Sequence, residues 1–574
     1  MTLFRVWAPF ARNVQLVLGG RPVPMQASGE YWSAEAAAAP GIDYSFVLDD
    51  REPLPDPRSP WQRLGVHGPS CVVDHAAFQW TDAGWQAPPL ASGIVYEIHT
   101  GTFTPEGTFD GAIDRIGYLA NLGITHAELM PVNEFPGGWG WGYDGVDLFA
   151  PHHAYGGPEA LKRFVDACHA AGLAVLLDVV YNHLGPAGNY LGRFAPYFTD
   201  RYSTPWGEAV NLDGAGSREV RRFFCDNALM WLRDYHFDGL RIDAVHAIFD
   251  FSAVHFLEQL ATEVKALEAH LGRHLAVIAE SDLNDPRIVT PRECGGYEID
   301  AQWSDDFHHA LHTVLTGETA GYYADFGKLA DLAKALENAY VYDGRDSIYR
   351  KRKHGRKPRG LSGSRFLGYL QNHDQVGNRA RGERSSQLMS RGRLKMAAAL
   401  VLCSPFVPML FQGEEFGATA PFQYFTNHPD PDLGRAVSEG RRREFAAAGC
   451  DPENIPDPQD PDTFLRSKIN WAEIEQEPHR ELLEWHCQLI ALRRAIPALT
   501  DGRLDRVQVR FCESGRWLAM QRGPVVLACN LGKERQAVPV PFTGALILAS
   551  AAESVAAGSA LELPPDSVAI LVAE

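Results

Sequence analysis

Between residues 94 and 411 the sequence alternates short apolar segments with longer segments of helical periodicity, and this alternation is its strongest constraint on the fold. Apolar residues at helical spacing occur at 113–122, from Pro158 onward and at 218–235. The apolar segments predict eight strands, at 94–104, 126–131, 173–182, 239–245, 275–279, 301–303, 366–371 and 407–411. Repeated strand–helix units favour a parallel sheet covered by helices. Eight such units predict an α/β protein built on a (β/α)8 TIM barrel with long inserted loops.

Regions with strand-like patterns flank this predicted barrel on both sides. Residues 1–90 contain short strand segments separated by Gly- and Pro-rich turns, which predict an N-terminal β-sandwich of the carbohydrate-binding kind. A helix at 480–494 would close the barrel, and strand-type alternation at 507–572 predicts a C-terminal β domain. We therefore expect three domains, at 1–90, 91–496 and 497–574.

The overall charge excludes some classes of partner. Lys and Arg number 53 against 72 Asp and Glu, and the resulting net charge of −19 opposes binding to nucleic acid or to anionic lipid. The longest apolar stretch, 396–411, is interrupted by Pro405 and Pro408 and is not a membrane span. The nine cysteines form no Cys-x-x-Cys motif, and residues 1–10 do not resemble a signal peptide. We expect a cytoplasmic protein with no nucleic-acid or membrane partner.

Polar side chains gather at the ends of four predicted strands. The segments are Asp178–His183, Gly239–His246, Ala279–Asp282 and Gln371–Asn378. In a TIM barrel the active residues lie at the carboxyl ends of the strands, where buried polar groups are costly unless they are paired or used. Any one of these carboxylates alone is as consistent with an ion pair at the barrel rim as with catalysis. The four strand ends together favour an active site.

The residue types at these strand ends suit glycoside hydrolysis. Arg241 and Asp243 are two residues apart on a strand and point the same way, so the guanidinium would keep Asp243 ionised, as a nucleophile requires. Glu280 follows the apolar run Leu-Ala-Val-Ile-Ala, and desolvation there would raise its pKa toward that of a proton donor. Asp374, beside His373, is placed to bind sugar hydroxyls. A glycosidase needs one ionised and one protonated carboxyl group.

These four segments resemble the signature regions of the α-amylase family of glycoside hydrolases. Within that family, the sequence is most similar to the maltooligosyl trehalose trehalohydrolases at 4–9, 96–109, 279–287, 300–309, 371–379 and 411–417. The resemblance implies a retaining enzyme that cleaves the α-1,4 bond next to the terminal trehalose of maltooligosyl trehalose and releases trehalose and a malto-oligosaccharide. It also implies functional coupling to a maltooligosyl trehalose synthase.

The resemblance further implies roles for individual residues. Asp243 would be the nucleophile, Glu280 the general acid/base and Asp374 the transition-state stabiliser. Around the cleaved sugar it implies Tyr143 as a stacking platform, with His183, Arg241 and His373 as hydroxyl and carboxylate partners. On the leaving-group side we expect His246, Asp305, Asp306, His308, Gln375 and Arg379. Trp139 and Trp141 fit sugar subsites and a cap on the barrel rim equally well.

No cofactor and no metal are expected. Asn182 matches a position that ligates calcium in many amylases, but the insertion after the third strand is not recognisable as a calcium domain. His308 and His312 have a helical metal-ligand spacing without a His-Glu-x-x-His motif. Two alternatives stay open. One is a glucan branching or debranching enzyme of the same family, which differs on the acceptor side, and the other is an inactive glucan-binding barrel.

Overall fold

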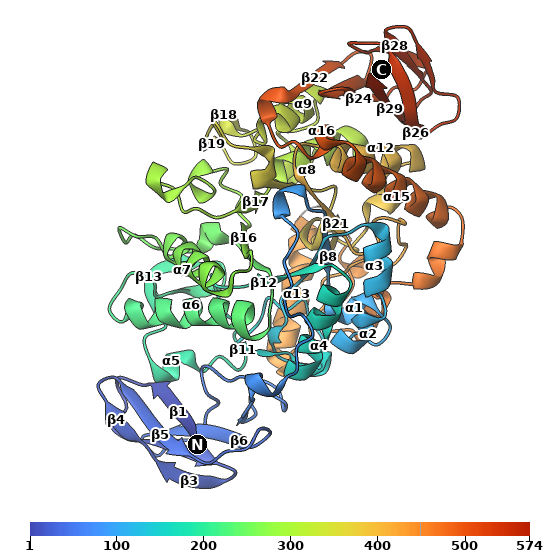
Figure 1. The fold of residues 1–574 in the computed structure, drawn as a ribbon. Coiled ribbons are helices and arrows are strands. Elements are labelled where there is room, and N and C mark those ends of the chain that lie inside the picture. The colour runs from blue at the N-terminus through green and yellow to red at the C-terminus, as the bar shows by residue number, and fades with distance from the viewer. Residues whose placement is uncertain (448, 450, 574) are drawn as a thin grey trace.

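A computed structural model describes residues 1–447, 449 and 451–573. Figure 1 shows a central barrel with the N-terminal sheets at its lower end and the C-terminal sheets at its upper end. Eight parallel strands close the barrel: β8 (Val95–Ile98), β9 (His126–Leu129), β12 (Ala174–Val179), β15 (Gly239–Ile242), β16 (Ala276–Ala279), β17 (Ala301–Trp303), β20 (Phe366–Gly368) and β21 (Val407–Phe411). The predicted TIM barrel is confirmed.

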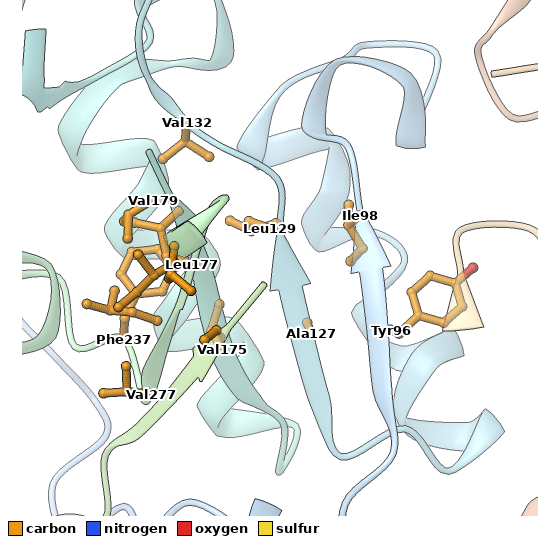
Figure 2. Close-up of a cluster of buried hydrophobic side chains, with 14 of the residues drawn as sticks. Tyr96, Ile98, Ala127, Leu129, Val132, Val175, Leu177, Val179, Phe237 and Val277 are labelled. Carbon is orange, nitrogen blue, oxygen red and sulfur yellow. The ribbon is translucent and has the colours of Figure 1, made fainter. Parts of the chain in front are cut away.

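Side chains alternate between the two faces of the barrel wall. Figure 2 shows the outward set under the helices, which includes Tyr96 and Ile98 of β8 and Val175, Leu177 and Val179 of β12. The inward set forms a separate apolar cluster inside the barrel: Val95, Leu176, Ala276, Ile278, Ala301, Trp303, Leu367, Tyr369, Val407 and Met409. Because both faces are covered, every residue of these eight strands is buried, as the continuous apolar runs in the sequence require.

Amphipathic helices cover the outer face of the barrel. In α4 (Gly157–Ala170) the stripe Leu161, Phe164, Val165 and Cys168 is buried, at the spacing seen in the sequence. The other helices of more than six residues between the barrel strands are α3 (Ile116–Leu122), α6 (Ser217–Asp234), α7 (Phe256–Leu271), α8 (Asp305–Thr316), α9 (Leu329–Asn338) and α12 (Arg391–Leu402). After the last barrel strand, α15 (His479–Ala495) packs against α12. None of the helices in the described residues combines the length and apolar composition that crossing a membrane requires.

Antiparallel sheets flank the barrel. One N-terminal sheet has the strand order β1 (Thr2–Trp7), β5 (Tyr31–Ala36), β4 (Gln26–Ser28). The other has the order β3 (Arg21–Pro24), β2 (Val14–Leu18), β6 (Asp43–Leu48), β7 (Ser70–Cys71). One C-terminal sheet has the strand order β22 (Val507–Cys512), β23 (Trp517–Arg522), β24 (Val525–Asn530), β29 (Ser567–Ala573), β26 (Gly544–Ala549). The other has the order β25 (Gln536–Pro539), β28 (Ala560–Leu563), β27 (Val555–Ala557). The domain boundaries at 90 and 496, and glucan binding by the N-terminal sheets, remain predictions.

Five barrel strands end earlier than the sequence predicts, and the first and fourth show the reason. The first stops at Ile98, because Thr100–Phe103 form a single helical turn, α1. The fourth stops at Ile242, because Ala244 takes a left-handed conformation with φ of 40° and a 3-10 turn follows at Val245–Ala247. Apolar residues such as Phe103 and Val245 lie within these turns, so an apolar pattern could not mark where extended backbone ends.

Two buried arginines join the barrel to the elements that follow it. Arg493 of α15 donates hydrogen bonds to the carbonyls of Leu402 (2.8 Å), Ser404 (3.1 Å) and Phe406 (2.8 Å), in the link between α12 and β21. Arg522 of β23 donates to the carbonyl of Cys403 at 2.8 Å. The link has no regular secondary structure, so these guanidinium groups satisfy carbonyls that would otherwise be buried without partners.

Replacing Arg493 with Met should therefore destabilise the protein while keeping the side-chain volume nearly constant. Each buried carbonyl left without a donor costs about 1–3 kcal/mol, which corresponds to a fall in the thermal midpoint of about 5 °C or more. Differential scanning calorimetry measures the shift. Arg494→Met, one position along on the exposed side of the same helix, is the matched control and should leave the midpoint within about 1 °C. Equal midpoints for the two variants would contradict the role of Arg493.

Candidate active site

A cavity of about 320 Å³ opens at the carboxyl ends of the barrel strands. Asp243 follows β15, Glu280 follows β16, and Asp374 lies in the short helix α10 (His373–Gly377) after β20. All three carboxylates line the cavity together with Tyr143, His183, His246 and His373. The strand ends that the sequence singles out therefore meet at one place.

Arg241 is the central cation of this site. Its side chain is fully buried and lies over the face of Trp303, with Cζ 4.1 Å from the ring centroid. Nη1 lies 2.7 Å from Asp178 Oδ2 and 2.9 Å from Asp243 Oδ1, and Nη2 lies 3.0 Å from Glu280 Oε2. One guanidinium thus contacts three carboxyl groups, and it holds Asp243 and Glu280 close to each other.

Asp243 is held as a carboxylate. Burial alone would raise its pKa, but the Arg241 guanidinium, the nearby His183 and a hydrogen bond from Asn182 hold the pKa of Asp243 below its usual value. Asn182 Nδ2 donates to Asp243 Oδ2 at 2.8 Å and to its carbonyl at 3.0 Å, and Asn182 Oδ1 lies 2.5 Å from His183 Nδ1. The amide of Asn182, which the sequence links to calcium binding, thus orients Asp243 here.

The pKa of Glu280 is shifted in the opposite direction to that of Asp243. Burial raises its pKa well above the usual value, the Arg241 charge opposes that rise, and the charges of Asp243 and Asp374 add to it. The Ala244 N–H donates to Glu280 Oε2 at 2.7 Å. Both this bond and the Arg241 contact use Oε2, which leaves Oε1 to carry a proton. Neighbouring carboxyl groups whose pKa values are shifted in opposite directions make an acid and a nucleophile at the same pH.

A chain of close contacts runs behind the cavity from the first barrel strand. His373 Nδ1 lies 2.5 Å from Glu97 Oε1, and His373 Nε2 lies 2.8 Å from the Tyr143 hydroxyl. That hydroxyl donates to Asp178 Oδ2 at 2.6 Å, which connects the chain to Arg241. Burial would lower the pKa of His373, but the charges of Glu97 and Asp374 raise it to about 9. His373 is therefore an imidazolium at neutral pH, and the Tyr143 ring stacks on it with centroids 5.1 Å apart.

Asp374 is more open than the other two acids, with 37% of its side chain exposed. The Asn372 side chain caps its helix by accepting from the N–H groups of Asp374 and Gln375, at 2.9 and 3.1 Å. Asp374 Oδ1 accepts a long 3.2 Å bond from Asn378 Nδ2 and lies 3.6 Å from His373 Nε2. This carboxylate is consequently fixed in position by its backbone and still able to accept bonds from a ligand.

Five residues expected on the leaving-group side do not line the cavity: Asp305, Asp306, His308, Gln375 and Arg379. Asp306 accepts from the N–H groups of Val341 and Tyr342 at 2.6 and 2.7 Å, so it stabilises a loop. Both ring nitrogens of His308 are engaged, by the Leu370 carbonyl and the Tyr323 hydroxyl.

Arg379 and Asp305 also have protein partners, whereas Gln375 Oε1 is buried without a hydrogen-bond partner among the described residues. Arg379 forms two 2.9 Å bonds with Glu318. Asp305 accepts from the Tyr369 hydroxyl at 2.5 Å, and burial raises its pKa to about 7. The structure therefore gives Asp306, His308 and Arg379 structural partners, while Asp305 acts on Glu280 through its charge.

Several functional neighbours are missing from the sequence prediction. Glu97 and Asp178 are charged residues at inward positions of apolar strands; Asp178 begins one of the four polar segments in the sequence, but no role is predicted from the sequence for either residue. Trp206 comes from the tip of the hairpin β13 (Phe198–Thr204) and β14 (Gly207–Val210) and stacks on His183, with centroids 4.2 Å apart. No spacing in the sequence connects this hairpin to the barrel. Trp139 and Trp141 both line the cavity.

Comparison with known proteins identifies close relatives over the full length of the chain. The family model for the alpha amylase catalytic domain matches residues 76–199, and a model for a domain of unknown function matches residues 502–570. The chain is 50% identical to a malto-oligosyltrehalose trehalohydrolase of a Rhizobium species, over 99% of this chain and 97% of the relative. It is 49% identical to one from Mycobacterium tuberculosis, over 100% and 99%. A crystal structure of a candidate alpha amylase from Salmonella typhimurium superposes with a TM-score of 0.92, at 40% identity, covering 100% of this chain and 97% of that one.

The contact between Glu97 and His373 predicts a shift in pH dependence. Glu97→Gln removes the negative charge, so the pKa of His373 should fall from about 9 toward its ordinary 6.5 or below. Because the folded-state pKa is raised, the stability contributed by protonated His373 is fully present below pH 6.5 and is lost as the pH rises through about 9. In the variant this loss, and the alkaline limb of the pH–rate profile, should move to lower pH.

Thermal midpoints and kcat/KM measured from pH 5.5 to about 10 test this expectation. Glu106→Gln removes a carboxylate from an exposed position nearby in the sequence and should leave both profiles unchanged. An alkaline limb at the same pH in the wild type and in Glu97→Gln would argue against the role of this contact.

Proposed function

The chain belongs to the malto-oligosyltrehalose trehalohydrolases of the α-amylase family, and we propose that Asp243, Glu280 and Asp374 carry out its reaction. As a trehalohydrolase it cleaves the α-1,4 bond that joins a malto-oligosaccharide to a terminal trehalose, and it releases trehalose. The observation that carries the assignment is the contact of one guanidinium, Arg241, with both Asp243 and Glu280.

In the first step, Glu280 gives its proton to the bridging oxygen while Asp243 attacks the anomeric carbon. The bond from that carbon to the bridging oxygen breaks, trehalose leaves, and the malto-oligosaccharide is held as an ester on Asp243. In the second step, Glu280 takes a proton from water, the water oxygen attacks the same carbon, and the Asp243 carboxylate is released. Two inversions give net retention at the anomeric centre.

The surrounding groups support each stage. The low pKa of Asp243 keeps the nucleophile ionised, and the raised pKa of Glu280 keeps a proton available for the leaving oxygen. Asp374 at the cavity wall can accept bonds from the hydroxyl groups of the distorted sugar ring, and His183, whose ring nitrogens contact the Asn182 amide oxygen and the Tyr143 carbonyl, forms part of the same wall. The Tyr143 ring, fixed between Asp178 and His373, offers an aromatic face to the sugar.

Selection of trehalose over maltose belongs to the leaving-group side. His246 lines the cavity in the turn that follows Asp243, and we assign it a contact with the departing disaccharide. Asp305 contributes charge to this side through its effect on Glu280, but it does not line the cavity. A malto-oligosaccharide ending in an α-1,1 linkage must first be formed by another enzyme. Coupling to a maltooligosyl trehalose synthase, and a cytoplasmic location in keeping with the eight free thiols of the described residues, are parts of the same proposal.

Paired substitutions separate the two carboxylate roles. Glu280→Gln should reduce the rate on maltooligosyl trehalose by about 10²-fold or more but spare a glycosyl fluoride, since fluoride leaves without protonation. Asp243→Asn should reduce both rates by several orders of magnitude, because the amide is nearly isosteric but not nucleophilic. Initial rates on the two substrates give the comparison, and circular dichroism controls for folding. Equal losses on both substrates in Glu280→Gln would remove Glu280 from the acid role.

Substrate choice tests the activity itself. Maltotriosyl trehalose and maltopentaose have equal length and offer the same α-1,4 bond, so chemistry alone gives no preference. Polar groups arranged for trehalose would be left unpaired by a linear maltosyl unit, at about 1–3 kcal/mol per buried group, so we expect at least a tenfold faster release of trehalose. Product chromatography gives both rates. Comparable rates, or transfer to a new α-1,6 branch, would favour a general amylase or a branching enzyme.

A further inference from the structure

A second group of chemically active side chains lies beside the cavity and has no part in the mechanism above. Glu134 ends strand β10 (Asn133–Glu134), and His152 and His153 follow strand β11 (Asp147–Pro151). The two strands pair antiparallel, with Glu134 opposite Asp147 and Asn133 opposite Pro151. Pairing of these strands brings three residues from two distant positions in the sequence to one point.

The distances in this group suit a single cation. Glu134 Oε1 lies 2.7 Å from His153 Nδ1 and 3.3 Å from His152 Nδ1, and the candidate ligand atoms of the three residues all lie within 4.8 Å of one another. The side chains of Glu134 and His152 are fully buried, whereas that of His153 is 31% exposed and gives access from solvent. Zn²⁺ bonds of about 2.0–2.2 Å to three such atoms need only small side-chain rotations.

His152 has a buried ring nitrogen, Nε2, without a hydrogen-bond partner in the described residues, so the group can bind a further ligand. The other ring nitrogen of His152, Nδ1, has only the 3.3 Å contact with Glu134 Oε1, although the side chain is completely buried. Its ring stacks on Phe135 with centroids 3.7 Å apart, and its backbone N–H donates to the Val132 carbonyl at 2.7 Å. Asp147 Oδ2, at the position opposite Glu134, is likewise buried without a partner. A fixed, buried ring nitrogen without a partner is costly unless something else binds it.

We propose that Glu134, His152 and His153 form a Zn²⁺ site that closes the base of the loop 135–146. Two imidazoles and a carboxylate are a donor set for zinc, with a fourth position left for water, whereas calcium prefers oxygen ligands alone. On binding, the proton on His153 Nδ1 that now faces Glu134 is released to solvent. This Zn²⁺ site departs from the sequence-based expectation of no metal. That expectation rested on Asn182 and on helical His spacings, whereas the pairing of β10 with β11 brings these three ligands together.

A metal ion at this site would hold the shape of the loop 135–146. The loop between Glu134 and Asp147 carries Trp139, Trp141 and Tyr143, which line the active-site cavity. The ligands lie on both sides of this loop, so the metal would link the two ends of the segment that shapes the sugar pocket. The reacting atoms are contacted by other residues, so metal binding can be tested independently of hydrolysis.

The test uses the full-length, chelator-treated protein and Zn²⁺ alone, followed by isothermal titration calorimetry. The wild type should bind one Zn²⁺ per chain. His153→Gln keeps a side-chain N–H for Glu134 but removes a ligand, and it should weaken binding by at least about 10- to 100-fold. His274→Gln changes a histidine that is 42% exposed and pairs with Glu268, and it should bind Zn²⁺ as the wild type does.

Two further measurements keep the proposal falsifiable if a variant is unstable. Co²⁺ in the wild type should give the visible absorption of a low-coordinate nitrogen–oxygen site, and Zn²⁺ should slow amide hydrogen exchange in residues 135–146. The proposal fails if the wild type binds no stoichiometric Zn²⁺, if His153→Gln binds as tightly as the wild type, if His274→Gln loses affinity to the same extent, or if Ca²⁺ binds equally well.

Discussion

The buried guanidinium of Arg241 organises the catalytic end of this barrel. Desolvating a cation costs several kcal/mol, and here the cost is offset by close contacts with Asp178, Asp243 and Glu280 and by the face of Trp303. Three carboxyl groups around one cation leave net negative charge. That surplus favours protonation of one carboxyl group, and burial together with the charges of Asp243 and Asp374 raises the pKa of Glu280 well above its usual value. The opposite pKa shifts of Asp243 and Glu280 thus follow from a charge imbalance inside a buried site.

Backbone geometry allows Arg241 to contact both Asp243 and Glu280. After β15 the chain turns sharply through Ala244, whose φ of 40° is unusual for a residue with a β-carbon. This conformation directs the Ala244 N–H to Glu280 and leaves Asp243 facing Arg241. Strained backbone of this kind costs on the order of 1–3 kcal/mol and persists where the surroundings over-determine it. Here the surroundings are the parallel strands β12 and β16 on either side of β15.

The sequence predicts the fold well because the barrel depends on short-range patterns. Buried strands read as apolar runs and α4 as a 3.6-residue stripe, and each needs only local sequence. The carboxylates at 243, 280 and 374 were found because strand ends converge by topology. Three long-range contacts could not be predicted from the sequence: Glu97 with His373, Trp206 with His183, and Asp306 with the N–H of Val341. These depend on loop paths, which residue spacing does not encode, and the assigned catalytic roles remain predictions.

The hairpin β13–β14 is a part of the pocket wall that can change in sequence and length during evolution. Trp206 at its tip reaches the sugar pocket, yet the hairpin contributes no strand to the barrel and no bond to Arg241. Insertions or exchanges there would reshape the pocket while leaving the contacts of Arg241 with Asp243 and Glu280 in place. Part of the pocket wall is consequently encoded outside the barrel strands, and evolution can modify this part while conserving the contacts of Arg241.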